Sequence, residues 1–255
     1  MKTLNNKQVE KLCRLMTHSD SVELKLTVAD SAIRSTADAL GMDPLEAEIR
    51  QVVFFDTPTL TLSKAGLVVR ARRIQGGEGD TVVKLRPVNP ATLSPEVRQL
   101  ASVKVEVDAV PKGFVCSASM KGKTTADDVR AVVLKKMKTR DLFTKEQRAF
   151  YKANAPEGLK LSQLSVLGPI NLLKLEFNPD GVKRKFVAEL WLYPDGSRIL
   201  ELSTKATPQD AFRVAAETRD FLKRKGLDLT AEQQPKTNRA LKHFTDLLKK
   251  VRARN

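Results

Sequence analysis

The feature that most constrains this chain is an alternation of charged and apolar side chains that recurs in one segment after another. Residues 21–28 (SVELKLTV) place valine or leucine at every second position, and Glu23 and Lys25 lie together on the opposite side of an extended chain. A sheet with one solvent-facing side also alternates, but that side usually draws freely on Thr, Ser, Gln and Asn. Charged residues at the centre of many strands would instead favour a charged interior face.

Six further segments repeat the pattern, at 67–73, 81–88, 102–110, 171–177, 183–192 and 197–205. Nearly every one has Arg, Lys or Glu at central positions, as in the pair Arg70 and Arg72 on one face of residues 67–73. If the sheet closes on itself, these faces line a channel in which cations bind phosphate oxygens and carboxylates hold a divalent metal. The pattern alone leaves open a plain solvated face.

The order of the elements favours the α+β class, because most strands are neighbours joined by turns, which is typical of an antiparallel sheet. Residues 51–58 predict one more strand, and PDG turns at 179–181 and 194–196 separate the last three strands. Helices are expected at about 7–16, 30–40, 207–226 and 237–251. Residues 111–165 are lysine-rich with helical spacing, so we interpret them as a helical insertion in a single domain, residues 20–250, after an N-terminal helix at 1–19.

The composition indicates an anionic partner, because the net charge is +15 over 255 residues. Nucleic acid and a small, highly charged phosphate compound both fit that charge, although no zinc-finger spacing or base-stacking motif is present. No apolar run approaches the roughly 18 residues needed to cross a bilayer, so no membrane is expected. Cys13 and Cys116 fit no metal spacing, which predicts a reducing cytoplasm.

Several of these segments, taken in order from about residue 20 to 245, resemble the CYTH proteins, also called triphosphate tunnel metalloenzymes. The resemblance rests on Glu23-Leu-Lys25, on residues 54–72 (FFDTPTLTLSKAGLVVRAR), on VVKL at 82–85 and on PKTNRAL at 235–241. It implies an eight-stranded antiparallel β-tunnel, a closed barrel flanked by helices, that binds triphosphate through Arg and Lys and holds Mg²⁺ or Mn²⁺ through Glu and Asp. Members of the family hydrolyse inorganic, thiamine or nucleoside triphosphates, and others cyclise ATP or build polyphosphate.

Carried over by position, the resemblance implies three sets of site residues. The phosphate-binding set would be Lys25, Arg70, Arg72, Lys84, Arg86, Lys174 and Lys236. The metal-binding set would be Glu23, Glu106, Glu189 and Glu201, and the catalytic set Glu23, Lys25, Glu106 and Glu201. The partner would be a triphosphate or polyphosphate rather than nucleic acid, and the protein a monomer or homodimer.

Two positions depart from the family pattern. The family's first strand carries two glutamates before its lysine, and Ser21 stands at the first of these; its last strand carries Glu-x-Glu, and Ser203 follows Glu201. A hydroxyl is a weaker Mg²⁺ ligand than a carboxylate. The leading prediction is a metal-dependent triphosphate hydrolase. The alternatives are a binding module with weakened catalysis, a cyclase-like activity, and nucleic-acid binding through the lysines of residues 112–152.

Overall fold

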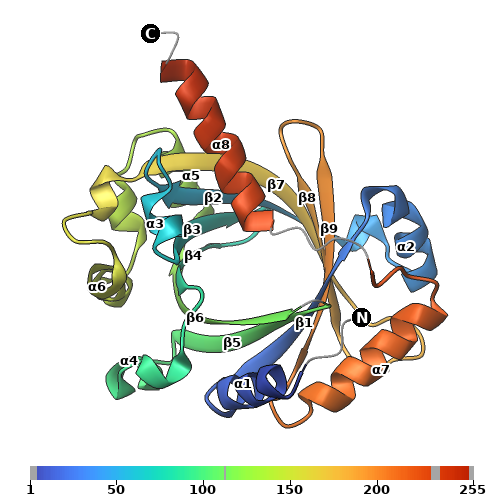
Figure 1. Cartoon of the computed structure of the whole chain (residues 1–255). Coiled ribbons are helices and arrows are strands. Elements are labelled where there is room, and N and C mark those ends of the chain that lie inside the picture. The colour runs from blue at the N-terminus through green and yellow to red at the C-terminus, as the bar shows by residue number, and fades with distance from the viewer. Residues whose placement is uncertain (1–4, 112, 231–235, 253–255) are drawn as a thin grey trace.

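Nine strands close into a barrel in the computed structural model, which describes residues 5–111, 113–230 and 236–252 (Figure 1). The strands are β1 (Ser21–Val28), β2 (Glu48–Asp56), β3 (Leu67–Ile74), β4 (Gly79–Leu85), β5 (Val103–Val110), β6 (Gly113–Thr124), β7 (Ser165–Phe177), β8 (Phe186–Leu192) and β9 (Arg198–Ala206). The helices are α1 (Asn6–Thr17), α2 (Ile33–Leu40), α3 (Thr61–Lys64), α4 (Pro95–Gln99), α5 (Ala126–Val133), α6 (Lys145–Asn154), α7 (Ala211–Arg224) and α8 (Lys236–Arg252).

The strands follow one another around the barrel in the order β1-β5-β6-β4-β3-β2-β7-β8-β9, and β9 pairs with β1 to close it. Neighbours pair antiparallel except β1 and β5, which are parallel. The predicted α+β class and closed barrel are confirmed. The predicted count of eight strands and the fully antiparallel pairing are wrong, because an odd number of strands cannot close a ring with every neighbour antiparallel.

The strand that sequence analysis missed is β6, which lies inside the predicted helical insertion at 111–165. It pairs with β4 on one side and β5 on the other, and only the later part of the segment is helical, as α5 and α6. The β6 sequence, GFVCSASMKGKT, is rich in small residues with little of the β-branched character that marks strands. Packing demands this at Gly122, where a Cβ would lie 2.4 Å from Oε1 of Gln147 on α6.

Helices cover the apolar outer face of the barrel, so the charged face points inward. Leu12 and Met16 of α1 pack on β5 and β6, while α5 and α6 cover β3 and β4. Leu40 of α2 and Phe221 of α7 cover β8 and β9. Apolar side chains of the strands therefore pack outward against the helices and most charged side chains point inward. Phe54, directly opposite Arg70, and Trp191 fill part of the interior with apolar rings.

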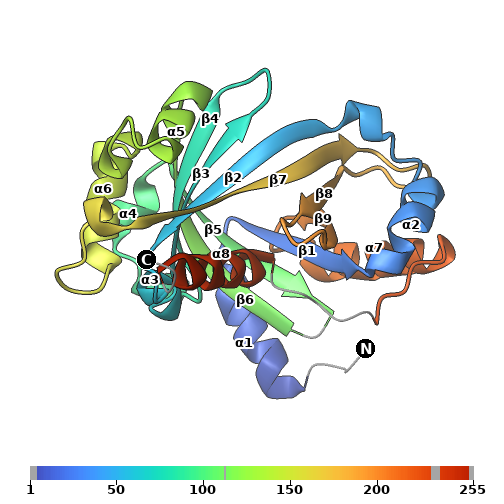
Figure 2. The same cartoon turned by 90° about the horizontal axis from the view of Figure 1, so that it is seen from above.

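Helix α8 lies across one mouth of the barrel (Figure 2). Its residues Leu241 and Phe244 form a buried cluster with Phe54, Leu172 and Trp191 of the neighbouring strands. Trp191 packs against Phe54 with ring centroids 6.4 Å apart. In the described ranges, no helix is long and apolar enough to cross a bilayer.

Candidate functional site

The barrel interior gathers the four cations on which the tunnel prediction depends. Lys25 comes from β1, Arg70 and Arg72 from β3, and Lys84 from β4. The charges of Lys25 and Arg70 repel the Lys84 ammonium, and the charge of Arg72 repels the Arg70 guanidinium. Side chains from three strands therefore share one interior space.

One side of this interior, which we call the basic wall, consists of Arg70 on β3, Lys84 on β4 and Lys121 on β6. Among the residues that the structure describes, Nε of Arg70 is buried without a hydrogen-bond partner, and neither lysine forms an ion pair. Burial lowers the pKa of Lys84 to about 8, and repulsion from Lys25 and Arg70 acts in the same direction, against the attraction of Asp108. Burial likewise lowers the pKa of Arg70 to about 10. The basic wall thus carries positive charge that these contacts leave unneutralised.

Arg72, the other β3 arginine on the interior face, already forms an ion pair. Its guanidinium holds the Asp80 carboxylate through Nε and Nη2, the latter 2.6 Å from Oδ2. Asp80 lies directly opposite Arg72 in the β3–β4 register. This fork-shaped contact fixes the Arg72 side chain beside the basic wall.

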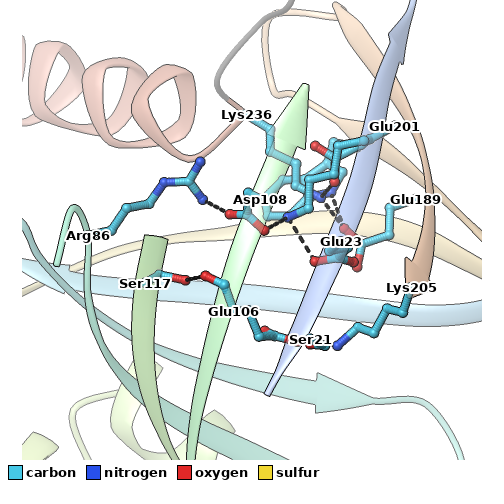
Figure 3. Close-up of polar contacts among 12 residues, drawn as sticks. Ser21, Glu23, Arg86, Glu106, Asp108, Ser117, Glu189, Glu201, Lys205 and Lys236 are labelled. Atoms are coloured by element: carbon cyan, nitrogen blue, oxygen red, sulfur yellow. Dashed lines mark hydrogen bonds and ion pairs between the residues drawn. The ribbon is translucent and has the colours of Figure 1, made fainter. Parts of the chain in front are cut away.

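The other side of the interior, which we call the acidic wall, carries carboxylates from four strands. They are Glu23 on β1, Glu106 and Asp108 on β5, Glu189 on β8 and Glu201 on β9. Each has a lysine or arginine partner among the described residues. Figure 3 shows these carboxylates gathered on strands that are neighbours in the barrel. The acidic wall is therefore neutralised by the protein itself.

Asp108 is the carboxylate nearest the basic wall. Its side chain is fully buried, Lys25 Nζ lies 3.1 Å from its Oδ1, and Arg86 donates to its Oδ2. Burial would raise the pKa of Asp108, but the charges of Lys25, Lys84 and Arg86 outweigh it and lower the pKa to about 2. Lys25 also lies 3.1 Å from Glu23, so these carboxylates hold its ammonium in place.

Lys236, the first residue of α8, reaches into the interior between two glutamates (Figure 3). Its Nζ donates to Glu189 Oε2 and to Glu201 Oε1, the second at 2.7 Å. The Trp191 ring lies 5.2 Å from the same Nζ, and Trp191 Nε1 donates to Glu189 at 3.2 Å. Burial alone would lower the pKa of Lys236, but the two glutamates reverse the shift and raise it.

Ser21 and Ser203, the two departures from the CYTH pattern, both lie on this acidic side. Ser21 is opposite Glu106 and donates to its Oε1 at 3.2 Å, and Lys205 donates to the same oxygen. Ser203 is buried on β9 opposite Lys25. Carboxylates at these two positions would have added negative charge beside Glu106 and Lys25.

Two members of the predicted phosphate-binding set lie away from the centre. The predicted strand 81–88 included Arg86, but β4 ends at Leu85, so Arg86 lies just after the strand. Its guanidinium still reaches the interior, where it donates to Asp108. Lys174 is opposite Glu189 in the β7–β8 register, but it donates to Glu176, which also pairs with Lys185. A role for either in binding phosphate stays a prediction.

Three interior residues were missing from the predicted set: Asp108, Lys121 and Lys205. The alternation in residues 102–110 placed Asp108 on the same face as Glu106, so a signal for it existed. Lys205 shares its face with Glu201 for the same reason. Lys121 had no usable signal, because β6 itself was not recognised.

The described residues contain no group of three or more carboxylate, imidazole or thiol side chains placed to hold a metal ion. Glu189 and Glu201 nevertheless converge on one cation, the Lys236 ammonium. Mg²⁺ commonly binds through one or two carboxylates and completes its shell with water and substrate phosphates. The donor set therefore fits a divalent metal that is held jointly by protein and phosphate.

A separate cavity of about 710 Å³ lies outside the barrel, between α1 and the segment that follows β4. Basic side chains such as Lys11, Arg14 and His18 share its lining with apolar ones such as Phe114 and Leu15. None of its lining residues belongs to the basic or acidic wall. We place the candidate site in the barrel interior, where the charges are buried and opposed.

Comparisons with known proteins support the fold. Neither a protein-family model nor a curated protein matches the sequence. Among solved structures, a candidate adenylyl cyclase from Hippeastrum with a dominant triphosphatase activity has 17% identity and a TM-score of 0.60, covering 80% of this chain and 87% of that one. A candidate adenylate cyclase from Bacillus halodurans has 12% identity and a TM-score of 0.60, covering 86% of this chain and 97% of that one. At such identities the likeness establishes a shared barrel fold.

Proposed function

We propose that this protein is a CYTH-type triphosphate tunnel enzyme, which binds a triphosphate-containing compound inside the barrel and hydrolyses its terminal phosphoanhydride with Mg²⁺ or Mn²⁺. The observation that carries the proposal is the basic wall, with a buried Arg70 Nε that lacks a partner in the described structure and a Lys84 whose pKa is lowered to about 8. Buried cations without counter-ions are costly. A polyanion between the walls would remove that cost.

The ligand's negative charge suits the interior cations. Arg70 offers a planar set of N–H donors to phosphate oxygens, and Lys84 offers a point charge beside it. Lys25 lies across from them, and Lys236 approaches from the α8 mouth. A triphosphate offers more negative charge and more acceptor oxygens to these groups than a single phosphate does.

Catalysis in this proposal is mainly electrostatic. Glu189 and Glu201, with Glu23 and Glu106, are the carboxylates that would hold the metal, which when bound would neutralise charge on the phosphate oxygens. Lys25 and Arg70 stabilise negative charge on the phosphoryl group as it transfers. Glu23, fixed by its contact with Lys25, orients the attacking water and accepts its proton.

The apolar cluster at the α8 end of the barrel assists this chemistry. Phe54, Trp191 and the α8 residue Leu241 are buried together at the same end as Lys236. This packing limits water at one end and favours entry of the substrate from the other. Charges inside a barrel with little water interact more strongly than they would at the surface.

A second candidate function is binding without efficient turnover. Two observations favour it. Ser21 and Ser203 stand where the CYTH pattern has glutamates, so two metal-binding carboxylates are missing. Lysines already pair with the carboxylates that are present, as Lys236 does with Glu201. Such a module would retain the basic wall and its affinity for triphosphate. It would release phosphate slowly or not at all.

Phosphate release from inorganic triphosphate, ATP and thiamine triphosphate, with Mg²⁺ or Mn²⁺, tests the proposal. Hydrolysis predicts release that Glu23→Gln lowers by about 100-fold or more without unfolding the protein. The matched control is Glu157→Gln, at an exposed position of the loop after α6. Triphosphate that raises the melting temperature without being cleaved would favour the binding module. Conversion of ATP to pyrophosphate and a cyclic nucleotide would favour a cyclase.

A further inference from the structure

The contact between Lys236 and the Glu189–Glu201 pair resembles an occupied cation site. Glu189 and Glu201 are directly opposite each other in the β8–β9 register, so their carboxylates come from adjacent strands. The Lys236 Nζ donates a hydrogen bond to each carboxylate at the point where the two meet. Two carboxylates around one cation is the protein's share of many Mg²⁺ sites.

Lys236 is held in this position by more than its charge. The exposed fraction of its side chain is 15%, its Nζ lies 5.2 Å from the Trp191 ring centroid, and the Tyr193 hydroxyl donates to its backbone carbonyl at 3.0 Å. A cation fixed to the same chain competes with free ions at a high effective concentration. A divalent metal entering alone would have to displace it and leave a buried ammonium without partners.

We propose that Lys236 is a tethered cation that excludes free divalent metal from the Glu189–Glu201 pair, so that metal binds only together with its phosphate ligand. This inference rests on the proposed function, because triphosphate oxygens supply the new partners that the Lys236 ammonium needs when it leaves the glutamates. The order of binding follows: the polyanion enters with its metal, and Lys236 moves from carboxylate to phosphate.

Mn²⁺ binding to the full chain tests the proposal without any measurement of activity. The concentration of free Mn²⁺, read from its electron paramagnetic resonance signal at pH 8, gives the affinity of wild type, Lys236→Met, Lys236→Arg and Lys185→Met. Lys185→Met is the matched control, since Lys185 also pairs with a glutamate, Glu176, but belongs to none of the predicted site sets. Because the tethered competitor is removed, we expect Lys236→Met to bind Mn²⁺ at least about tenfold more tightly than wild type, with the other two variants unchanged.

The fold of each variant is checked by its melting temperature and by the fluorescence of Trp191, the single tryptophan. Should Lys236→Met fail to fold, Lys236→Gln retains a hydrogen-bonding group and carries the same expectation. Equal Mn²⁺ affinity in wild type and the Lys236 variant, or an equal gain in Lys185→Met, would overturn the inference.

Addition of triphosphate separates this inference from the function on which it rests. We expect wild type to bind Mn²⁺ once triphosphate is present, and triphosphate alone to raise its melting temperature. Absence of that rise in melting temperature would overturn the proposed function and, with it, the binding order. A gain in Mn²⁺ affinity by the Lys236 variant would still establish Lys236 as the competitor.

Discussion

The two walls of the barrel interior treat their charges in opposite ways. On the acidic wall, every carboxylate has a lysine or arginine partner from the described chain, and Asp108 has two. On the basic wall, Lys84 and Lys121 lack such partners within the same residues, and the Nε of Arg70 is orphaned. Within the described ranges the basic wall lacks counter-ions, whereas every carboxylate of the acidic wall has at least one. The exception to full pairing there is Oδ1 of Asp108, which contacts Lys25 without an aligned hydrogen bond.

Because of this contrast, removing a charge should change the stability of the fold in opposite directions on the two walls. Charge removed from the acidic wall leaves a buried partner alone, which destabilises the fold. Charge removed from the basic wall relieves repulsion, which stabilises the ligand-free fold while weakening ligand binding. A residue that lowers the stability of the ligand-free fold but strengthens ligand binding is typical of a functional site.

The largest expected effect is on ligand affinity. Arg70→Met removes several charge-assisted hydrogen bonds to phosphate, so the affinity for inorganic triphosphate should fall about 100-fold, or about 3 kcal/mol. Isothermal titration calorimetry measures this directly. The matched control is Arg73→Met on the outer face of the same strand, where Arg73 donates to Gln51. An equal loss in both variants would mean that the barrel's overall charge, and not the basic wall, binds the ligand.

The next effect concerns the stability of the acidic wall. Glu201→Gln leaves the Lys236 ammonium with one carboxylate in place of two, and the three side chains are only partly exposed, at 13–18%. We expect the free energy of unfolding to fall by about 2 kcal/mol, below the full value for a buried pair because some solvent screening remains. Urea denaturation measures it, with the more exposed Glu176→Gln as control. An unchanged stability would show that the acidic wall is not held by its pairs.

Affinity should also depend on pH through Lys84. Its pKa is lowered to about 8 in the ligand-free protein, and a polyanion binds the charged form. Affinity for triphosphate should therefore fall as the pH rises above about 8, approaching tenfold per pH unit. Lys84→Arg should remove this dependence, because a guanidinium keeps its charge over this pH range. A flat profile in wild type would exclude Lys84 from the site.

The smallest expected effect is a gain in stability, opposite to the loss expected for Glu201→Gln. Because the lowered pKa of Lys84 means that folding disfavours its proton, Lys84→Met should raise the stability of the ligand-free protein at pH 7 by about 1 kcal/mol. The gain should shrink as the pH rises from about 8 toward 10.5, where the wild-type lysine loses its charge. Thermal unfolding measures it, with exposed Lys104→Met as control. A loss of stability at pH 7 would contradict the contrast between the walls.

Much of this arrangement could be predicted from the sequence because a strand has a period of two. The alternation around Lys25, Arg70 and Lys84 indicated which side chains share a face. It left a plain solvated face open, and the closed barrel was implied by the resemblance. The partners within the interior depend on register between strands far apart in sequence, which periodicity does not encode. The pairing of Glu106 with Ser21 and Lys205 is one example.

The parallel β1–β5 junction was unpredictable for a different reason. It follows from the extra strand β6, whose small residues match the packing of Gln147 and α6 but give weak strand signals. Lys236 illustrates a third limit. Its position near the acidic wall follows from the packing of α8 across the barrel mouth, which depends on Trp191 and Phe244 in three dimensions.

The most direct test of the account is a crystal structure of the protein with inorganic triphosphate and Mn²⁺, in which anomalous scattering locates the metal. We predict the triphosphate between the two walls, with phosphate oxygens within hydrogen-bonding distance of Arg70 and Lys84. The Mn²⁺ would lie at Glu189 and Glu201, with the Lys236 ammonium moved onto phosphate. Triphosphate bound only on the outer surface, with Lys236 still between its two glutamates, would contradict the account.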